Sequence, residues 1–194
     1  MANTKQRIIA EATRILAKFG YAQFSIGEVA TTLQVSKGVI NYHFPEKAGL
    51  LQAIVDDFYR RAAEYMGANM RLDTSAAETL RSYIETNLTF VANNRTAAIA
   101  TTSILLNARD KNGDLVFQDA SGGIYQPLIE IFTYGQEVDG SFRDFDSHLM
   151  AYILRGTIDS AAQFIMKHSV AESEALINEI ITTFDLATRR KNNE

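Results

Sequence analysis

The sequence predicts an all-α fold, and two features of the 194-residue chain carry this prediction. Apolar residues recur at spacings of three and four along nearly the whole chain, which is the period of a helix with one buried face. The chain also has only two prolines, and proline is the residue that most often ends a helix. Because 46% of the residues are apolar, a chain of this length can bury a substantial core.

The N-terminal end should form three helices, each with its own start or stop signal. Gly20 ends the first helix. Ser25 and Glu28 have the spacing of a capping box, in which each side chain satisfies a backbone N–H group at the start of a helix. Ser36 is the next candidate N-cap, since a serine oxygen accepts hydrogen bonds from the N–H groups of the first helical turn. These helices are expected over residues 4–19, 26–33 and 37–44. Two short helices joined at residues 34–36 are typical of a helix-turn-helix.

Similar signals divide the rest of the chain. Pro45 cannot lie inside a helix, so a long fourth helix should begin near Glu46. Ser75 and Glu78 form a second capping-box pattern. Pro127 is tolerated only within a first turn, so another helix should begin just before it. The further helices are expected over about residues 46–66, 75–93, 96–108, 123–135, 146–167 and 172–189.

Charge is distributed unevenly along the chain. The net charge of −4 alone argues against nucleic-acid binding, because such domains usually carry a basic excess. Residues 1–47, however, carry six basic and three acidic side chains, and the remainder carries 13 basic and 20 acidic ones. A basic head on an acidic body indicates that only the head meets a polyanion.

Composition also excludes several classes of protein. The chain has no cysteine, which removes disulfide scaffolds, thiolate catalysis and cysteine zinc sites. The N-terminus lacks the apolar segment of a signal peptide, and no run reaches the roughly 18 apolar residues of a membrane span. We therefore expect a soluble, cytoplasmic protein without membrane contact.

A dense set of residues across positions 12–51 follows a known pattern. They are Ala12, Leu16, Phe19-Gly20-Tyr21, Phe24-Ser25, Ile26, Val29-Ala30, Leu33, Val35-Ser36-Lys37-Gly38, Tyr42-His43-Phe44, Lys47 and Leu50-Leu51. This set resembles the N-terminal signature of the tetracycline-repressor (TetR) family of bacterial regulators. The rest of the chain is similar to that family in helix number, length and order. The resemblance implies nine helices, a homodimer held by the last two, and an effector pocket inside the body.

On this basis we expect a helix-turn-helix DNA-binding domain over residues 1–46 and a ligand-binding and dimerisation domain over residues 47–194. Three residues depart from the family pattern. Gln34 occupies a turn position usually filled by glycine, Asn41 replaces a tyrosine that touches DNA, and Glu46 replaces a serine cap. If the backbone at Gln34 has a positive φ, a residue other than glycine costs about 1 kcal/mol there. These departures concern the operator sequence and its contacts, not the motif.

The third helix is expected to enter the major groove. Ile40 and Phe44 are four residues apart and should face the protein, which leaves its other side chains toward DNA. Lys37 can donate to guanine or to a phosphate, and Asn41 can pair with adenine. The expected DNA-binding residues are Ser25, Lys37, Gly38, Val39, Asn41, Tyr42, His43 and Lys47. The resemblance implies phosphate contacts for Tyr42, His43 and Lys47. The alternative is ordinary surface packing or, for Lys37, a solvated charge.

The body is expected to hold a small apolar or amphipathic effector. A concave apolar site with a few placed polar groups is the usual form of such a pocket. The expected ligand-binding residues are Tyr83, Asn87, Phe90, Thr102, Tyr125, Phe132, Asp159 and Gln163. For each aromatic residue the alternative is plain core packing. Arg155 and Asp159 lie on a polar stripe that fits a pocket floor and a solvated i, i+4 pair equally well.

The last two helices carry the stripes expected at a dimer interface. Small residues at the centre of the eighth helix allow close approach of another helix, and apolar residues recur along the ninth. The expected interface residues are Leu149, Ile153, Gly156, Ser160, Phe164, Ile177, Ile180 and Phe184.

Catalytic and metal sites find no support in the sequence. No nucleophile motif or glycine-rich phosphate loop is present. Asp144, Asp146 and His148 could offer metal ligands, but aspartates at such a loop-to-helix junction are ordinary caps. We therefore predict no enzyme, no cofactor and no metal. The predicted function is a repressor released from a palindromic operator by its effector; the alternatives are an activator or a helical ligand-binding protein without operator binding.

Overall fold

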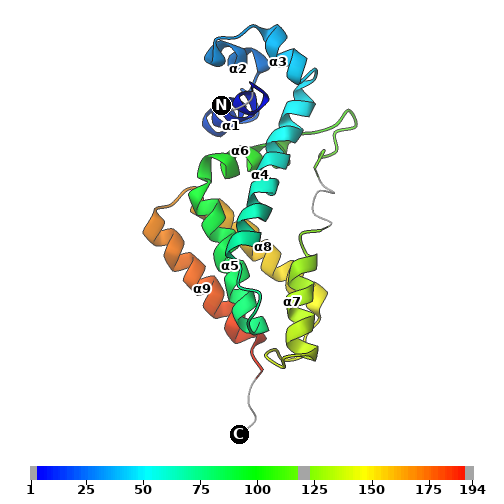
Figure 1. The fold of residues 1–194 in the computed structure, drawn as a ribbon, viewed down its shortest axis with the longest axis vertical. Coiled ribbons are helices and arrows are strands. Elements are labelled where there is room, and N and C mark those ends of the chain that lie inside the picture. Colours follow the sequence, from blue (N-terminus) through cyan, green and yellow to red (C-terminus); the bar gives the residue numbers. More distant parts are fainter. Residues whose placement is uncertain (1–3, 118–122, 191–194) are drawn as a thin grey trace. The chain divides into compact units, whose positions relative to one another are not determined.

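The computed structural model describes residues 4–117 and 123–190, and in these ranges the chain forms nine α-helices and no strand longer than an isolated bridge (Figure 1). The all-α prediction is confirmed. In the same ranges, no helix has the length and apolar character needed to cross a membrane.

The chain divides into two compact units, Met1–Arg61 with Asn94–Gln118, and Ala62–Asn93 with Asp119–Glu194. The first unit contains residues from both sides of the boundary expected at residue 46. The reason is that α6 (Arg95–Asn107), far along the sequence, packs against α1 (Thr4–Phe19). A backbone hydrogen bond from Tyr21 to Oγ of Ser103, 3.2 Å long, also joins these segments.

The helix-turn-helix lies in the first unit as α2 (Ile26–Leu33) and α3 (Lys37–His43), followed by α4 (Lys47–Asn69). Ser25 caps α2 by accepting the N–H of Glu28 at 3.2 Å. Gln34 ends α2 with a φ of 57°, the only positive φ outside glycine among the described residues. The backbone at Gln34 therefore does have the positive φ considered in the sequence analysis, and a residue other than glycine occupies a left-handed position that favours glycine.

One apolar core holds the first unit together. Because α2 and α3 are too short to be stable alone, their inward residues pack on α1, on the start of α4 and on α6. This core contains Ile8, Ala12, Ile15, Leu16, Phe24, Val29, Ala30, Ile40, Phe44, Leu50, Leu51, Ile54, Val55, Ala100, Ile104 and Ala108.

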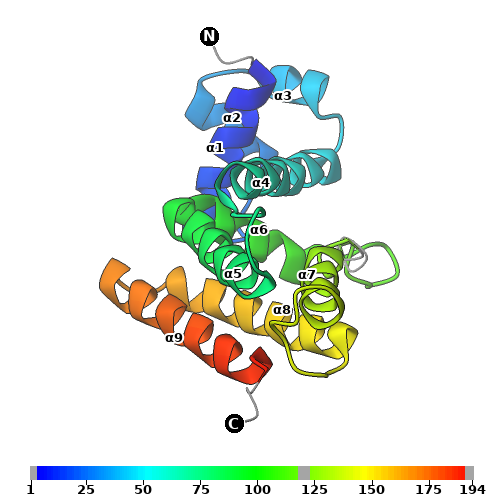
Figure 2. The same ribbon diagram turned by 60° about the horizontal axis from the view of Figure 1, so that its bottom comes forward.

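The second unit is built from α5 (Ala76–Asn93), α7 (Gln126–Glu137), α8 (Ser147–Ile165) and α9 (Val170–Thr188). Within it, α5 packs against α7, α8 and α9, and α8 packs against both α7 and α9 (Figures 1 and 2). The helix ends agree with the expected ones to within about three residues; α7 begins three residues later than expected and α9 two residues earlier. The start of α9 is set by a full capping box between Ser169 and Glu172.

The connection between α7 and α8 is pinned to the end of α9. Phe142 forms an isolated bridge with Arg189, and the N–H groups of Arg143 and Arg190 donate to the carbonyls of Thr188 and Ser141 at 2.9 and 3.0 Å. Phe142 itself is buried, with its ring edge-on to Phe132. These main-chain bonds fix the loop against the last turn of α9.

Candidate DNA-binding surface and ligand pocket

The outer face of α3 is exposed while its inner face is anchored. Ile40 and Phe44 are buried, as expected from their spacing of four. Asn41 and Tyr42 are exposed, and 84% of the Tyr42 surface is accessible. Most of the Tyr42 side chain therefore lies in solvent, which argues against the alternative of ordinary packing.

The other expected contacts on α3 differ in exposure. Lys37 and Gly38 are exposed, whereas Val39 and His43 are half-buried. The His43 ring packs edge-on to Tyr42, with 5.1 Å between centroids. The structure thus places these side chains on one short helix, with Lys37, Gly38, Asn41 and Tyr42 reaching solvent most fully.

Lys47 has an internal role that the sequence did not reveal. Its Nζ donates to the backbone carbonyl of Phe24 at 3.1 Å and lies over the rings of Tyr21 and Phe24, 5.0 and 5.3 Å from their centroids. The side chain therefore ties the start of α4 to the segment before α2. An ammonium group carries three donors, so one such bond leaves others for a phosphate.

Two further residues of the first unit belong to the start of α2. Ser25 is exposed, but its hydroxyl is used as the cap of α2. Gly27, in the first turn of α2, carries the end of the Lys37 side chain: a Cβ atom at Gly27 would lie 3.0 Å from Cε and 3.3 Å from Nζ of Lys37. Lys37 is therefore turned toward α2.

The structure does not gather the expected ligand-binding residues around one of the cavities found in the described residues. Tyr83, Phe90 and Phe132 are buried core residues, and Asn87 is half-buried. Tyr125 is half-buried and stacks on Tyr152, with 6.1 Å between centroids. The remaining three are elsewhere: Thr102 belongs to α6 in the first unit, and Asp159 and Gln163 are exposed on α8.

The polar stripe on α8 is divided between interior and solvent. Arg155 turns inward, with 15% of its side chain exposed, and its Nε donates to Oδ1 of Asp159 at 3.0 Å. Burial alone would lower the pKa of Arg155, but the hydrogen bond and charge of Asp159 outweigh it and raise the pKa. For Tyr83, burial raises the pKa, and this effect exceeds the lowering caused by the charge and hydrogen bond of Arg155. The two groups therefore stay protonated and hydrogen-bonded between α5 and α8.

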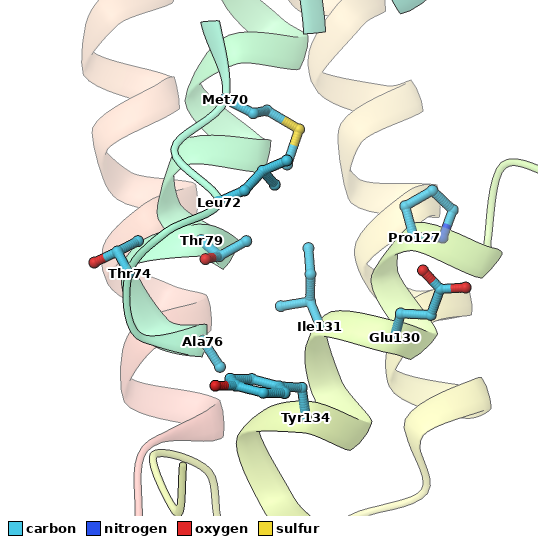
Figure 3. Close-up of a pocket in the computed structure, with 9 residues that line it drawn as sticks. All are labelled: Met70, Leu72, Thr74, Ala76, Thr79, Pro127, Glu130, Ile131 and Tyr134. Carbon is cyan, nitrogen blue, oxygen red and sulfur yellow. The ribbon is translucent and has the colours of Figure 1, made fainter. Parts of the chain in front are cut away.

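A cavity of about 280 Å³ lies elsewhere in the second unit, between the segment after α4, the start of α5, and α7 (Figure 3). Its lining residues are Met70, Leu72, Thr74, Ala76, Thr79, Pro127, Glu130, Ile131 and Tyr134. In Figure 3, Met70 and Leu72 point from one wall toward Ile131 on the other. Glu130 is the charged residue among them, and its Oε1 accepts from Nε2 of Gln126 at 2.9 Å. This site was not predictable from the sequence, because a third of its lining residues belong to the segment between α4 and α5, and periodicity does not specify the path of such a segment.

The expected interface residues separate into two groups. On α8, Leu149, Ile153, Gly156 and Ser160 are exposed, with 63% of Leu149 and 56% of Ile153 accessible, and Tyr152 extends this apolar surface. Phe164 is half-buried and stacks on His168. On α9, the expected residues Ile177, Ile180 and Phe184 are buried within the chain's own second unit, where α9 packs on α5 and α8.

Asp146 at the start of α8 is a helix cap, as the sequence indicated. Asp146 is its N-cap and accepts the N–H groups of His148 and Leu149 through Oδ1 at 2.9 and 3.0 Å. Asp146 therefore has a structural role that requires no metal.

Comparisons with known proteins agree with this architecture. Residues 8–54 match the family described as "Bacterial regulatory proteins, tetR family". The fatty acid metabolism regulator protein of Bacillus subtilis is 24% identical over 178 residues, which cover 90% of each chain. A bacterial regulatory protein of the tetR family from Rhodococcus RHA1 has a similar structure, with a TM-score of 0.80 and 20% identity over 99% of this chain and 100% of that one.

A transcriptional regulator from Saccharomonospora viridis, solved in complex with choline, is also similar in fold. Its TM-score is 0.74, at 21% identity over 96% of this chain and 98% of that one. The matched segment contains the whole helix-turn-helix with its exposed α3, and the likeness in fold extends over both units. The helix-turn-helix segment of the chain therefore matches the TetR family of bacterial regulatory proteins, and the chain as a whole is similar in fold to solved proteins of that family.

Proposed function

We propose that the protein is a homodimeric repressor that binds a palindromic operator through α3 of each protomer and leaves it when a small molecule binds the second unit. The observation that carries the DNA-binding part is the contrast across α3. Ile40 is fully buried while Tyr42 on the opposite side is 84% exposed. A short helix anchored from one side and bare on the other can enter the major groove without rearranging its own core.

The contacts on α3 have separable roles. Tyr42 donates to phosphate and positions the head, whereas Asn41 pairs with a base and confers sequence preference. A duplex selected from a random library by the wild-type protein, and a scrambled duplex of equal length, serve as probes. Tyr42→Ala weakens binding to both duplexes equally. Asn41→Ala costs roughly 1 to 3 kcal/mol on the selected duplex only.

Asn178→Ala is the matched control, because Asn178 is an exposed asparagine on α9. It leaves both affinities unchanged. Equal weakening of both duplexes by Asn41→Ala would contradict its assignment as a base contact. A wild-type protein that selected no duplex would favour the alternative of a helical ligand-binding protein without operator binding.

Dimerisation is proposed through the exposed stripe of α8. Leu149, Ile153 and Tyr152 are large apolar residues that face solvent in the single chain. A contiguous exposed apolar surface of this kind marks an interaction site, and Gly156 and Ser160 beside it let a second helix approach closely. A two-fold symmetric dimer presents two copies of α3, so its operator has two related half-sites.

The effector is proposed to bind the cavity between α5 and α7. Met70 and Leu72 in its wall directly follow α4, the helix that begins at Lys47, four positions after α3 ends at His43. A ligand between these residues and Ile131 can therefore displace the end of α4, and a small helix movement is a common switching element. The comparison proteins support a small organic effector: one is a fatty acid metabolism regulator and another was solved with choline.

The chemistry of the cavity favours an amphipathic molecule with a neutral or cationic head. Its wall is mostly apolar, and the charged residue in it is the carboxylate of Glu130, which repels a carboxylate ligand and attracts an ammonium group. Calorimetric titrations with decyltrimethylammonium, decanol and decanoate test this, and decanoate should bind most weakly. Glu130→Gln should remove the difference between the charged probes. Tightest binding of decanoate would contradict the assignment of this cavity.

Coupling to DNA is measured with the same probes. A ligand that binds the cavity should weaken operator binding by about 5- to 150-fold, which is the usual range of allosteric coupling. Linkage then requires the operator duplex to weaken ligand binding by the same factor. Equal ligand affinities with and without the duplex would contradict the switch while leaving DNA binding itself intact.

A further inference from the structure

The Lys37 side chain does not project from α3 along the face that carries Asn41 and Tyr42. Its end lies over Gly27 in the first turn of α2, where a Cβ atom would come within 3.0 Å of Cε and 3.3 Å of Nζ. Such a separation is shorter than the 3.5–4.0 Å at which carbon atoms pack favourably. A methyl group at Gly27 would therefore require the end of the Lys37 side chain to shift by a few tenths of an ångström.

Nothing within the described part of the chain holds the Lys37 ammonium group by charge. No carboxylate lies within 4.0 Å of it, and Glu28, the acidic residue of the same turn of α2, forms no ion pair with it there. The cation is therefore available to an external anion, and its position is set by the shape of α2.

The position of α2 decides which part of the DNA that cation meets. In a helix-turn-helix the second helix lies in the major groove while the first crosses the sugar-phosphate backbone. Here α3 is the helix that enters the groove and α2 is the one at the backbone. A lysine that begins on α3 and lies against α2 is thus directed to a phosphate, although its first position in α3 suggests a guanine contact.

We infer that Gly27 is a positioning residue for DNA recognition: it seats Lys37 against α2, so that Lys37 contacts a backbone phosphate and leaves base reading to the neighbouring residues of α3. The inference rests on the proposed DNA binding. It decides between the two contacts that the sequence left open for Lys37, a guanine and a phosphate, and it gives Gly27 a role that its place in a capped helix does not suggest.

The two assignments differ in a measurable quantity, the dependence of affinity on salt. A phosphate contact releases counterions, and each one steepens the slope of log K against log[salt] by about 0.9. Extrapolated from 1 M salt to 0.1 M, a slope of 0.9 corresponds to about an 8-fold gain in affinity for each head. A base contact changes the ratio of affinities for selected and scrambled duplexes, whereas a phosphate contact does not.

The experiment is a double-mutant cycle with wild type, Gly27→Ala, Lys37→Ala and the double variant. Each protein is titrated with the selected and the scrambled duplex at four salt concentrations. Lys37→Ala should reduce the slope by about 0.9 per head and weaken both duplexes by the same factor. Gly27→Ala should weaken binding in the wild-type background, by up to about 8-fold per head at 0.1 M salt, and have no effect once Lys37 is absent.

Folding is controlled within the same set. Alanine is a better helix former than glycine, so Gly27→Ala should not unfold α2. Gly67→Ala in α4 is the matched control, because a Cβ atom there meets nothing within 4 Å. It should change neither affinity nor slope. In the free wild-type protein, nuclear Overhauser effects should join the Gly27 Hα and Lys37 Hε protons.

The possible failures are distinguishable. A changed ratio between the two duplexes in Lys37→Ala would make Lys37 a base contact and overturn the inference, while the proposed DNA binding would stand. An unchanged salt slope in Lys37→Ala would also overturn the inference. The same holds if Gly27→Ala does not weaken DNA binding in the wild-type background, or still weakens it when Lys37 is absent. Absence of these Overhauser effects would contradict the contact between the Lys37 side chain and Gly27. A wild-type protein that bound neither duplex would overturn both the inference and the proposed function.

Discussion

Replacing Gly135 with alanine should destabilise the second unit more than any ordinary glycine-to-alanine change in a helix. A Cβ atom at Gly135 would lie 2.2 and 2.6 Å from two ring carbons of Phe142 and 2.8 Å from Cβ of Ala76. Carbon atoms pack at about 3.5 Å or more, so the Phe142 ring would have to retreat by more than about 1 Å.

The Phe142 ring has little room for that movement. It is 1% exposed and lies 5.9 Å from the Phe132 ring, and its backbone N–H donates to the carbonyl of Gly135 at 3.0 Å. Overpacking of this kind costs about 1 to 3 kcal/mol, and the constraint on Phe142 favours the upper end. Alanine returns about 1 kcal/mol through its helix propensity. The expected net loss is about 2 kcal/mol, or roughly 4 to 8 °C in Tm for a chain of this size.

Urea unfolding followed by circular dichroism measures this loss. Gly67→Ala, whose new methyl group meets nothing within 4 Å, should instead be stabilising by up to about 1 kcal/mol. In a Phe142→Ala background most of the cost of Gly135→Ala should disappear, because the clashing ring is gone and only the 2.8 Å approach to Cβ of Ala76 remains. A Gly135→Ala protein as stable as wild type would refute the packing argument.

Three further outcomes follow from particular residues. Gln34→Gly should raise the free energy of unfolding by about 0.5 to 1 kcal/mol, because relief of the strain at φ 57° exceeds the added entropy of the unfolded chain; a loss measured by urea unfolding would contradict this. Burial alone would raise the pKa of Asp139, but hydrogen bonds from Ala76 and Ser141 outweigh it and lower the pKa. Its stabilising effect is therefore present above about pH 4 and lost as the pH falls through the folded pKa, and a pH series should be flatter on the acid side for Asp139→Asn. Gly156→Leu adds a side chain at an exposed site with nothing within 4 Å, so the chain should fold but sediment as monomer or aggregate; an unchanged dimer would place the interface elsewhere.

Local signals made the head of this protein predictable from its sequence. The ends of α2 follow from Ser25, whose hydroxyl caps the helix, and from the turn before Ser36. Pro45 likewise fixes the break between α3 and α4. Each of these signals acts within four residues, so the chain's own chemistry determines the result without knowledge of distant contacts.

Signals that depend on tertiary contacts were not readable in the same way. The spacing of Ile177, Ile180 and Phe184 indicates a buried stripe, but periodicity does not say whether a stripe packs on its own chain or on a partner, and here it packs on its own unit. The same ambiguity applies to Phe132, which is a core residue, whereas Leu72 lines the cavity from a segment with no periodicity at all. Lys47 and Lys37 show that charge alone does not indicate where a side chain points.

The pinned loop between α7 and α8 has a consequence for hydrogen–deuterium exchange. Arg143 and Arg190 are exposed residues outside helices, a setting in which amides normally exchange within seconds to minutes, yet their N–H groups are bonded to the carbonyls of Thr188 and Ser141. Their protons can exchange only when the loop separates from the end of α9. Protection at these two amides should therefore rise and fall together with the last turn of α9, as one cooperative opening unit. Removal of the chain from Thr188 onward, which takes away the acceptor of the Arg143 N–H, should abolish the protection at Arg143 before the helices themselves begin to exchange.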